Sequence, residues 1–295
     1  MKALSALFLP ALLLPLLIPD TARADCANPT ASAGEVVFNK DYCVMQFCNG
    51  LNWIPTGKPD PQACNNACSV PDLVAHWKLD ESSGTTASSV IGGYTGGLNN
   101  GPVWNPSGGK KGGALAFDGV NDYMAVPSSA AFDSNGTWMF WFKTNGIWGT
   151  DGGNPSDIAN ILGRHNSSSS FRGIHISLYP PAAGRPVVEM KNDSGAVCNF
   201  SSVFTGLTDN TWHHVAVAYA KENGATNQIY VDGLLAGSCT NSAAWSFNNQ
   251  TIRFGDSADT HWEEYQGLLD DVRFYGRKLT SGEVSTIYNG AGGCQ

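Results

Sequence analysis

Charged side chains are scarce in this sequence, and acidic ones outnumber basic ones. Asp, Glu, Lys and Arg make up 14% of the 295 residues, against roughly 25% in an average soluble domain. The formal net charge is −8, so the chain has no overall positive field to attract nucleic-acid phosphates or anionic lipids. Gly, Ser, Asn and Thr fill the gap, which is typical of a turn-rich extracellular β protein. The composition therefore argues against nucleic acid as a partner.

Long apolar runs are missing beyond the first residues. Lys2 precedes an apolar run at 3–19 that two prolines interrupt, and segment 21–24 ends in an Ala-x-Ala pattern. This layout predicts a cleaved signal peptide, 1–24. A membrane anchor is the alternative, but the run is shorter than the ~20 residues that a spanning helix needs. We therefore expect a secreted protein, extracellular, at the cell surface or periplasmic, with no membrane span.

Cysteine is plentiful. The chain has eight cysteines, an even number that fits disulfides in an oxidising compartment. They are concentrated near the start, so residues 25–70 are predicted to form a small disulfide-rich β ribbon with a hairpin turn at Asn49-Gly50. Zinc is the alternative, but the spacings Cys43-x4-Cys48 and Cys64-x3-Cys68 are loose for a zinc site.

Residues 71–295 are predicted to form a large all-β domain. Short segments that alternate apolar and polar residues recur along it, which is typical of a two-sheet antiparallel sandwich. Asp232-Gly233 predicts a tight hairpin, and the capping box of Thr280 and Glu283 predicts one helix near the end. Strands are expected at 74–79, 114–119, 123–126, 138–142, 158–162, 173–178, 186–191, 197–200, 212–219, 228–231, 234–237, 252–254 and 269–275.

The hairpin also suggests how the last cysteines pair. Cys198 lies near the strand that begins at Trp212, and Cys239 ends the second hairpin strand. We expect these two to form a disulfide. An odd number of cysteines then remains in the small module, so parity links one of them to Cys294.

Five segments of the large domain form a recognisable series. They are Ala75-His76-Trp77-Lys78-Leu79-Asp80, Gly113-Ala114-Leu115-Ala116-Phe117-Asp118-Gly119, Trp212-His213-His214-Val215, Ile229-Tyr230-Val231-Asp232-Gly233 and Leu269-Asp270-Asp271-Val272-Arg273-Phe274-Tyr275. With them, the chain at 73–290 resembles the laminin-G-like jelly roll of the concanavalin A-like lectin/glucanase superfamily. The resemblance implies a two-sheet antiparallel jelly roll. It also implies an adhesive, glycan-binding or spacer role, and often a structural Ca²⁺ ion near the Phe-Asp-Gly turn.

The calcium hypothesis rests on acidic side chains. Asp118 is the first candidate ligand, followed by Asp270 and Asp122, because calcium takes hard oxygen ligands. The alternative is that Asp118 and Asp122 only form turns through their own backbone and that Asp270 is a buried acceptor. Strict alternation would place Asp270 on the inner face with Val272, and Asp271 on the other face.

No catalytic pattern accompanies the resemblance. Glucanases of this superfamily carry a Glu-x-Asp-x-x-Glu strand, which this sequence lacks. The Arg-x-Glu-x-Arg strand of alginate-lyase-like jelly rolls is missing too, and Gly173-Ile174-His175 departs from their Gln-x-His strand. The adjacent His213 and His214 point to opposite faces of a strand, so they cannot share one metal ion. We therefore expect a protein that is not an enzyme.

Aromatic residues in loops are the candidate ligand-binding side chains, since a flat ring can stack on a sugar. They are Trp148, Tyr179, Trp245 and Trp262, whereas Trp77, Trp138, Trp141 and Trp212 fall on expected strands and suit a core. Packing under long loops is the alternative for each. The sequence thus predicts a secreted, non-catalytic protein that binds a carbohydrate or cell-surface polymer through loops at one end of the sandwich. A structural or protein–protein adhesion module of an envelope or appendage is the alternative, and a polysaccharide-cleaving enzyme comes third.

Overall fold

The computed structural model describes residues 26–27, 30–31, 36–39, 44–48, 53–55, 70–146, 158–165, 172–179, 184–247, 249–256 and 263–290. The predicted signal peptide and residues Trp148, Trp262 and Cys294 lie outside this part. The chain divides into two compact units, Met1–Asn65 and Asn66–Gln295. In the described part, none of the helices has the length and apolar character needed to cross a membrane.

The first unit contains short β strands. β1 (Cys26–Ala27) pairs with β2 (Thr30–Ala31), and β3 (Val36–Asn39), β4 (Val44–Cys48) and β5 (Trp53–Pro55) form an antiparallel three-stranded sheet. Cys48 is fully buried and disulfide-bonded. So short a ribbon buries little apolar surface, and covalent links compensate for the small core.

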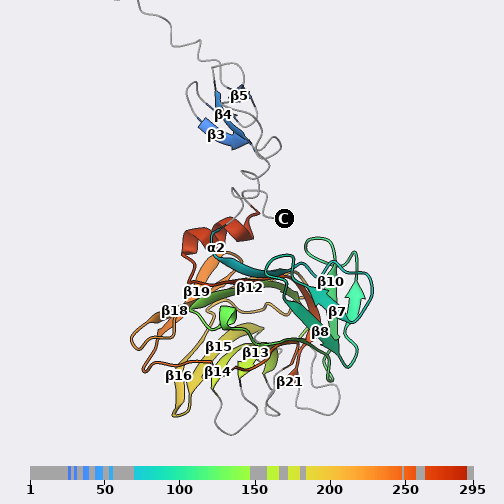
Figure 1. The fold of residues 1–295 in the computed structure, drawn as a ribbon, viewed down its shortest axis with the longest axis vertical. Helices are drawn as coiled ribbons and strands as arrows, with labels where there is room; N and C mark the ends of the chain where they lie inside the picture. Colours follow the sequence, from blue (N-terminus) through green and yellow to red (C-terminus); the bar gives the residue numbers. More distant parts are fainter. Residues whose placement is uncertain are drawn as a thin grey trace, which may run out of the picture. The chain divides into compact units, whose positions relative to one another are not determined.

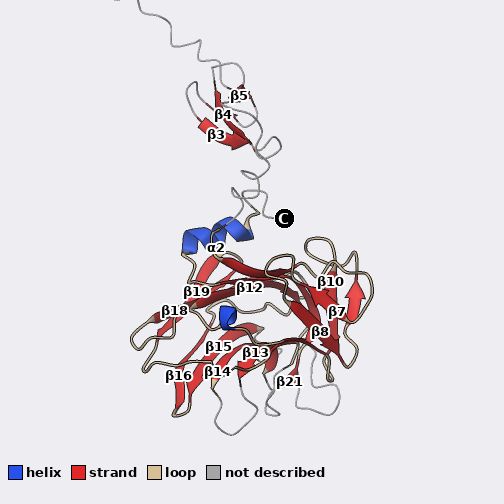
Figure 2. Ribbon diagram, in the orientation of Figure 1, coloured by secondary structure: helices blue, strands red, loops and turns tan. Residues whose placement is uncertain are grey.

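The second unit is a sandwich of two sheets, which confirms the predicted fold class (Figures 1 and 2). The eight-stranded sheet contains β6 (Leu73–Trp77), β9 (Val103–Asn105), β10 (Ala114–Asp118), β12 (Gly136–Lys143), β17 (His213–Tyr219), β18 (Thr226–Val231), β19 (Leu234–Thr240) and β22 (Gln266–Tyr275). The nine-stranded sheet contains β7 (Thr86–Ser88), β8 (Thr95–Asn99), β11 (Tyr123–Val126), β13 (Ala159–His165), β14 (Gly173–Tyr179), β15 (Arg185–Asn192), β16 (Gly195–Ser201), β20 (Ile252–Phe254) and β21 (Glu263–Glu264). Two helical segments accompany them, η1 (Ala130–Phe132) and α2 (Ser281–Tyr288).

The main core lies between the two sheets. Its centre is a cluster of aromatic rings in which Trp77 and Trp138 stack at 6.4 Å and Phe274 lies 4.6 Å from Trp138. Each such side chain contributes about 1.5–3 kcal/mol to folding when it leaves water. Two of the predicted core tryptophans lie elsewhere. Trp141 is buried on the outer side of the eight-stranded sheet, and Trp212 is only partly buried, just before β17.

α2 covers a second, smaller core on the outer side of the eight-stranded sheet (Figure 1). Val284 and Ile287 of the helix pack there with Met139, Tyr230 and Tyr275. The predicted capping box is present, because the Thr280 side chain accepts from the Glu283 amide and the Glu283 carboxylate accepts from the Thr280 amide. The hairpin at Asp232-Gly233 is also confirmed, with positive φ angles of 47° and 77°.

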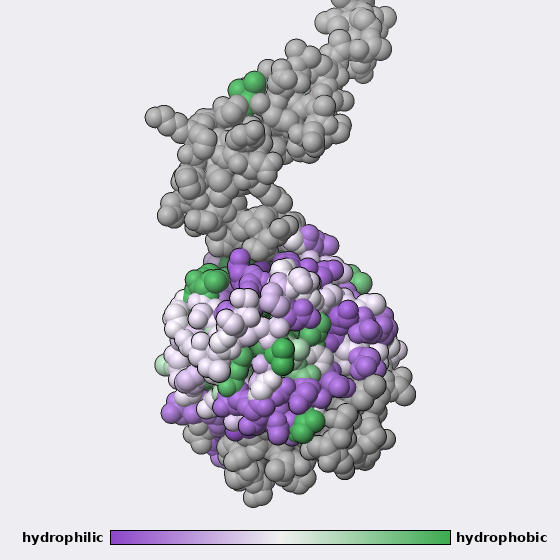
Figure 3. Space-filling model, turned by 90° about the vertical axis from the view of Figure 1, so that its right-hand side faces the viewer, coloured by the Kyte–Doolittle hydropathy of each residue, from purple (hydrophilic) through white to green (hydrophobic). Residues whose placement is uncertain are grey.

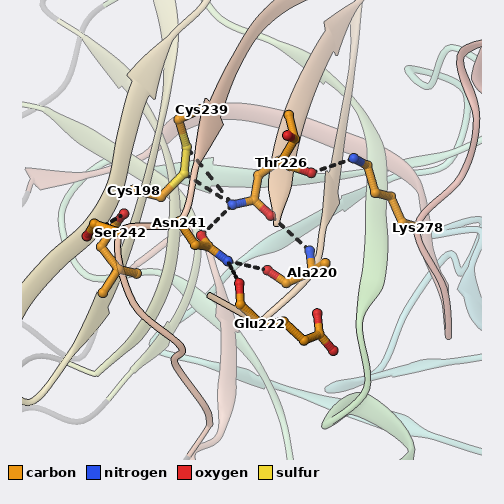
Figure 4. Close-up of a disulfide and its surroundings, with 10 residues drawn as sticks. Cys198, Ala220, Glu222, Thr226, Cys239, Asn241, Ser242 and Lys278 are labelled. Carbon is orange, nitrogen blue, oxygen red and sulfur yellow. Dashed lines mark hydrogen bonds between the residues drawn. A yellow bond between two sulfur atoms is a disulfide. The ribbon is translucent and has the colours of Figure 1, made fainter. Parts of the chain in front are cut away.

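A disulfide joins the edge strands of the two sheets. Cys198 on β16 and Cys239 on β19 are bonded, with Cα atoms 6.0 Å apart, as the sequence predicts. Asn227 Nδ2 lies 3.1 Å from the sulfur of Cys198 and donates to Asn241 Oδ1 at 2.7 Å. Asn241 lies beside the disulfide and donates to the carbonyls of Ala220 and Glu222 (Figure 4). The bond therefore ties the sheets together at one side of the sandwich, within a buried amide network.

The alternation on β22 breaks at Asp271, which corrects one expectation. Asp271 has a φ of 51°, and the pairing of β22 with β12 shifts register there. Leu269 and Val272 therefore both point into the core. Asp270 and Asp271 both lie on the outer side, where Lys111 donates to each of them, at 2.8 and 3.2 Å. The prediction that Asp270 faces inward with Val272 is wrong, because the bulge adds one residue to the strand.

Candidate functional site

One line of paired residues crosses the nine-stranded sheet from edge to edge. Each member is the cross-strand partner of the next, and each comes from a different strand. We call it the cross-strand row. Its members, in order, are Asn199, Glu189, His175, Gly163, Arg253, Ala125, Gly97 and Thr86.

The row lies on the outer face of the sheet because side chains alternate along each strand. On β14, Ile174, Ile176 and Leu178 belong to the core between the sheets. His175, Ser177 and Tyr179 therefore point away from the core. The sheet thus combines an apolar inner face with an outer face that carries charged and amide side chains.

Polar groups at one end of the row hold one another in place. Glu189 Oε2 lies 3.0 Å from Lys191 Nζ, and Asn199 Nδ2 lies 3.3 Å from Glu189 Oε1. Asn160 Nδ2 lies 2.8 Å from Nδ1 of His175, whose side chain is almost fully buried. These contacts fix the buried members, whereas Asn199 is exposed.

Small residues make the middle of the row low. Gly163, Ala125 and Gly97 project little or nothing above the backbone, and a Cβ added to Gly97 would meet only a backbone oxygen at 4.0 Å. Arg253 stands between them, held by Asp256 at 2.7 Å and lying 4.5 Å from the ring centre of Tyr123. The middle of the row therefore carries one long side chain, that of Arg253, between small residues.

Tyr179 lies at the end of β14, two residues along the same face from Ser177. It is 40% exposed, and the guanidinium of Arg185 lies 5.3 Å from its ring centre. Among the four aromatic residues predicted to bind ligand, Tyr179 is therefore the one that the structure places on this face with an accessible ring.

The structure describes one of the other three predicted aromatics, Trp245. Trp148 and Trp262 lie outside the described residues. Trp245 is 5% exposed and packs against Tyr219 at 5.6 Å and Phe247 at 5.1 Å. The expectation that Trp245 is a loop-tip stacking ring is wrong, because the segment after β19 folds back over the core.

Two of the three predicted calcium ligands lie together. Asp118 and Asp122 flank the turn after β10, where the Asp118 amide donates to Asp122 Oδ2 at 3.1 Å. Asp122 is 3% exposed, and burial raises the pKa of its carboxyl group. Its Oδ1 has no hydrogen-bond partner in the described part of the chain. A calcium site at this turn stays a prediction.

Asp270 does not belong to that turn. Asp118 pairs with Gln266 of β22, four residues from Asp270, which corresponds to about 13 Å along the strand. Asp270 is buried, and its Oδ2 accepts from the Lys111 amide at 2.8 Å. Within the described ranges, no three His, Cys, Asp or Glu side chains gather in a way that could hold a metal ion.

The row itself could not be found from the sequence. His175 and Glu189 are visible there only as isolated residues, and no local spacing relates them to Arg253 or Gly163. Their relation arises from the register of seven strand pairs. The detectable signal is the polar alternate position on β14 and β15, which marks an outer face but not its alignment.

Comparisons with solved structures place this sandwich among known folds. The binding domain of Paraclostridial Mosquitocidal Protein 1 matches with a TM-score of 0.59 and 17% identity, over 74% of this chain and 52% of that one. This chain thus spans about half the length of that structure. Domain 4 of the arabinanase AbnA from Geobacillus stearothermophilus, in complex with arabinotriose, matches with a TM-score of 0.54 and 17% identity, over 74% of this chain and 98% of that one.

An enzyme structure matches as well. The Trypanosoma rangeli sialidase, in complex with the inhibitor DANA, has a TM-score of 0.56 and 16% identity, over 78% of this chain and 34% of that one. At such identities these likenesses establish the fold alone. No curated protein sequence matches this chain.

A family model supplies the family. It matches residues 118–285, more than half of the chain, and so confirms the resemblance seen in the sequence. The protein belongs to the concanavalin A-like lectin/glucanases superfamily.

Proposed function

We propose that the large domain is a non-catalytic carbohydrate-binding module and that a polysaccharide lies along the cross-strand row. The row is the observation that carries this proposal. Its accessible members are Asn199, Arg253 and Thr86, whose amide, guanidinium and hydroxyl groups suit the hydroxyl groups of successive sugars. Tyr179 adds an exposed ring on the same face, four residues along β14 from His175 and so about 13 Å to one side of the row. A line of polar side chains with few aromatic contacts suits an extended polymer better than a single small molecule.

The solved structures support the same class of function. One similar structure is the binding domain of a mosquitocidal protein, and another is an arabinanase domain that contains arabinotriose and of which this chain covers 98%. We extend a binding role to this chain by analogy.

A non-catalytic role is supported by the contacts of two polar residues in the row, Glu189 and His175. Glu189 is engaged by Lys191 and Asn199, and His175 is buried and bound to Asn160. A general acid or base must reach the reacting atoms, and these two side chains are instead used to order their neighbours. The third alternative, a polysaccharide-cleaving enzyme, would release reducing ends from a bound polysaccharide.

The alternative of a protein–protein adhesion module would favour a large exposed apolar patch. Figure 3 shows the face of the sandwich that lies on the right in Figure 1, where hydrophobic residues form small separate groups in a mostly hydrophilic surface. On this face the surface therefore suits a polar ligand such as a carbohydrate better than an apolar protein interface.

We also propose that the protein is exported. The signal-like segment at 1–24 and the cross-sheet disulfide support an oxidising destination. Fusion of residues 1–24 to a reporter enzyme should direct it out of the cytoplasm of an exporting host. Retention of the fused reporter in the cytoplasm would contradict this proposal.

A third proposal concerns calcium at the turn that holds Asp118 and Asp122. The buried, unpaired Oδ1 of Asp122 supports it, because a carboxylate oxygen in that position gains a partner from a cation. We expect millimolar Ca²⁺ to raise the melting temperature of the wild type and not that of Asp122→Asn. An equal rise in both proteins would contradict the site.

The test of the main proposal is a polysaccharide array probed with the mature chain, 25–295, followed by titration calorimetry on the best ligand. Asn199→Ala, Arg253→Gln and Tyr179→Ala should each weaken binding about tenfold, since each removes a contact worth about 1.5 kcal/mol. Arg172→Gln is the matched control. Its guanidinium pairs with Asp193, and it precedes β14, outside the cross-strand row.

Other outcomes identify the alternatives. Binding unchanged in all three variants would contradict the row as the site. A blank array with intact circular dichroism would favour the adhesion module, and the release of reducing ends from a bound polysaccharide would favour the enzyme.

A further inference from the structure

A hollow of about 700 Å³ lies on the outer side of the other, eight-stranded sheet, beside the C-terminal end of α2. Three lysines, one carboxylate and two aromatic rings are prominent in its lining: Lys78, Lys110, Lys111, Asp80, Trp141 and Tyr288. It shares no residue with the cross-strand row. What it could bind follows from its charges, its rings and its hydrogen-bonding groups.

The charge around the hollow is positive, although the whole chain carries −8. Asp271, beneath it, is already matched by Arg273 at 3.0 Å, Lys111 at 3.2 Å and His76 at 2.5 Å. One carboxylate oxygen of Asp80 accepts a hydrogen bond from the Gly113 amide at 2.6 Å. Burial raises the pKa of Asp270 to about 7, so this carboxyl group is only partly ionised at neutral pH. Cations therefore outnumber carboxylates here.

Two of the lysines are available for a ligand. In the described part of the chain, neither Lys78 nor Lys110 forms an ion pair with a carboxylate, and Lys110 is exposed. An ammonium group that faces a hollow without a counter-ion is a preferred partner for an anion.

Aromatic rings form part of the wall. Trp141 stacks against Tyr288 at 5.5 Å with an angle of 25°, and Lys110 Nζ lies 4.6 Å from the centre of the Trp141 ring. Trp141 is 4% exposed, whereas Tyr288 is only partly buried. His214 lies 5.1 Å from Trp141, and burial lowers the pKa of its imidazole to about 3, so it stays neutral. Tyr288 is thus the ring that a ligand can reach.

The rim adds hydrogen-bond acceptors. Tyr288 ends α2, and Asn289 and Gly290 follow it at the edge of the hollow. The carbonyl groups of Ser285 and Ile287 already accept from the Asn289 and Gly290 amides. The carbonyls that follow them, of Tyr288 and Asn289, lie at the end of the helix, where the helix interior supplies no partner, and they suit the hydroxyl groups of a ligand rather than its carboxylate.

We propose that this hollow is a second ligand site and that it binds an acidic sugar. The carboxylate of the sugar would lie between Lys78 and Lys110, a ring face against Tyr288, and hydroxyl groups toward the carbonyls after α2. The proposal stands independently of the row, because it uses the other sheet and another ligand class.

The test uses the mature chain and two probes, sodium glucuronate and methyl glucoside, in titration calorimetry or NMR at low salt. We expect glucuronate to bind at least fivefold more tightly than the neutral sugar, and the difference to shrink at 0.5 M salt. Lys78→Gln and Lys110→Gln should each weaken glucuronate binding about three- to tenfold. Lys278→Gln, which removes a lysine that donates to the carbonyl of Thr226 away from the hollow, should leave it unchanged.

Three results would overturn the proposal. They are equal binding of both probes, glucuronate binding that survives Lys78→Gln/Lys110→Gln, and equal competition by acetate, which would reduce the site to bare anion binding. Loss of glucuronate binding in Arg253→Gln, with the lysine variants unaffected, would place the acidic sugar on the row instead. Failure of polysaccharide binding in the array leaves this measurement intact, so the two proposals are tested separately.

Discussion

The burial of Asp270 makes the stability of the fold depend on pH. The carboxyl group is fully buried, accepts one amide from Lys111, and has a pKa raised to about 7 by burial and by the neighbouring Asp271. A carboxyl whose folded pKa lies above its unfolded value of about 3.9 stabilises the fold at low pH, and this contribution is lost as pH rises through the folded pKa.

Asp270→Asn should therefore gain stability relative to the wild type as pH rises. Asn keeps the acceptor for the Lys111 amide and removes the buried charge, so we expect the difference in unfolding free energy to shift by about 1–3 kcal/mol in favour of the variant between pH 4 and pH 8. Urea denaturation at both values measures it. A difference that does not change with pH would show that Asp270 titrates normally in the folded protein.

Trp245 was predicted to bind ligand, but in the structure it belongs to the main core. Its ring packs on Tyr219 and Phe247 in the main core. Trp245→Ala should therefore lower the unfolding free energy by about 3–5 kcal/mol, and the fraction that remains folded should bind polysaccharide as the wild type does. Chemical denaturation and calorimetry distinguish this outcome from a loss of binding at unchanged stability, which would return Trp245 to the ligand surface.

At the scale of elements, α2 depends on its N-terminal cap. The Thr280 hydroxyl accepts from the Glu283 amide, and Glu283 also pairs with Arg277 at 2.6 Å. We expect Thr280→Ala to cost about 1 kcal/mol and Thr280→Ser to cost much less. Thermal unfolding of the two variants measures the cap. An equal loss of stability in Thr280→Ala and Thr280→Ser would show that the packing of Val284 and Ile287, rather than the cap, stabilises the helix.

The strands show what local pattern predicts and where it stops. Long alternating segments such as 173–178 and 213–219 were predictable, because one face needs apolar residues and the other does not. β8, with the sequence Thr-Gly-Gly-Leu-Asn, and the three-residue strands β7 and β9 were missed, since they carry almost no apolar pattern of their own. Tertiary pairing alone makes them strands.

Register and irregularity were also beyond the sequence. The bulge at Asp271 places Asp270 on the outer face, and the register of β10 against β22 sets Asp118 opposite Gln266, four residues from Asp270, so the predicted group of three ligands became a pair and a single residue. The cross-strand row and the lysine-lined hollow both depend on strands far apart in the chain. The family and the sandwich were predictable from the sequence, whereas the candidate surfaces required the structure.

At the scale of the whole molecule, the Cys198–Cys239 disulfide joins the two sheets covalently at one edge of the sandwich. It closes a loop across 41 residues of sequence separation. Cys198→Ala/Cys239→Ala should lower the unfolding free energy by about 2–4 kcal/mol. Dithiothreitol should destabilise the wild type by a comparable amount beyond its effect on this double variant. An identical effect on both proteins would assign the loss to other disulfides.

The alternation of β14 has a consequence for how such a domain can diversify. Ile174, Ile176 and Leu178 serve the core, while His175, Ser177 and Tyr179 lie on the other face of the same strand. Tyr179, which is 40% exposed, can therefore change while the first set conserves the fold. A lineage could therefore change its ligand specificity one strand at a time, with each inherited substitution tested on an unaltered scaffold.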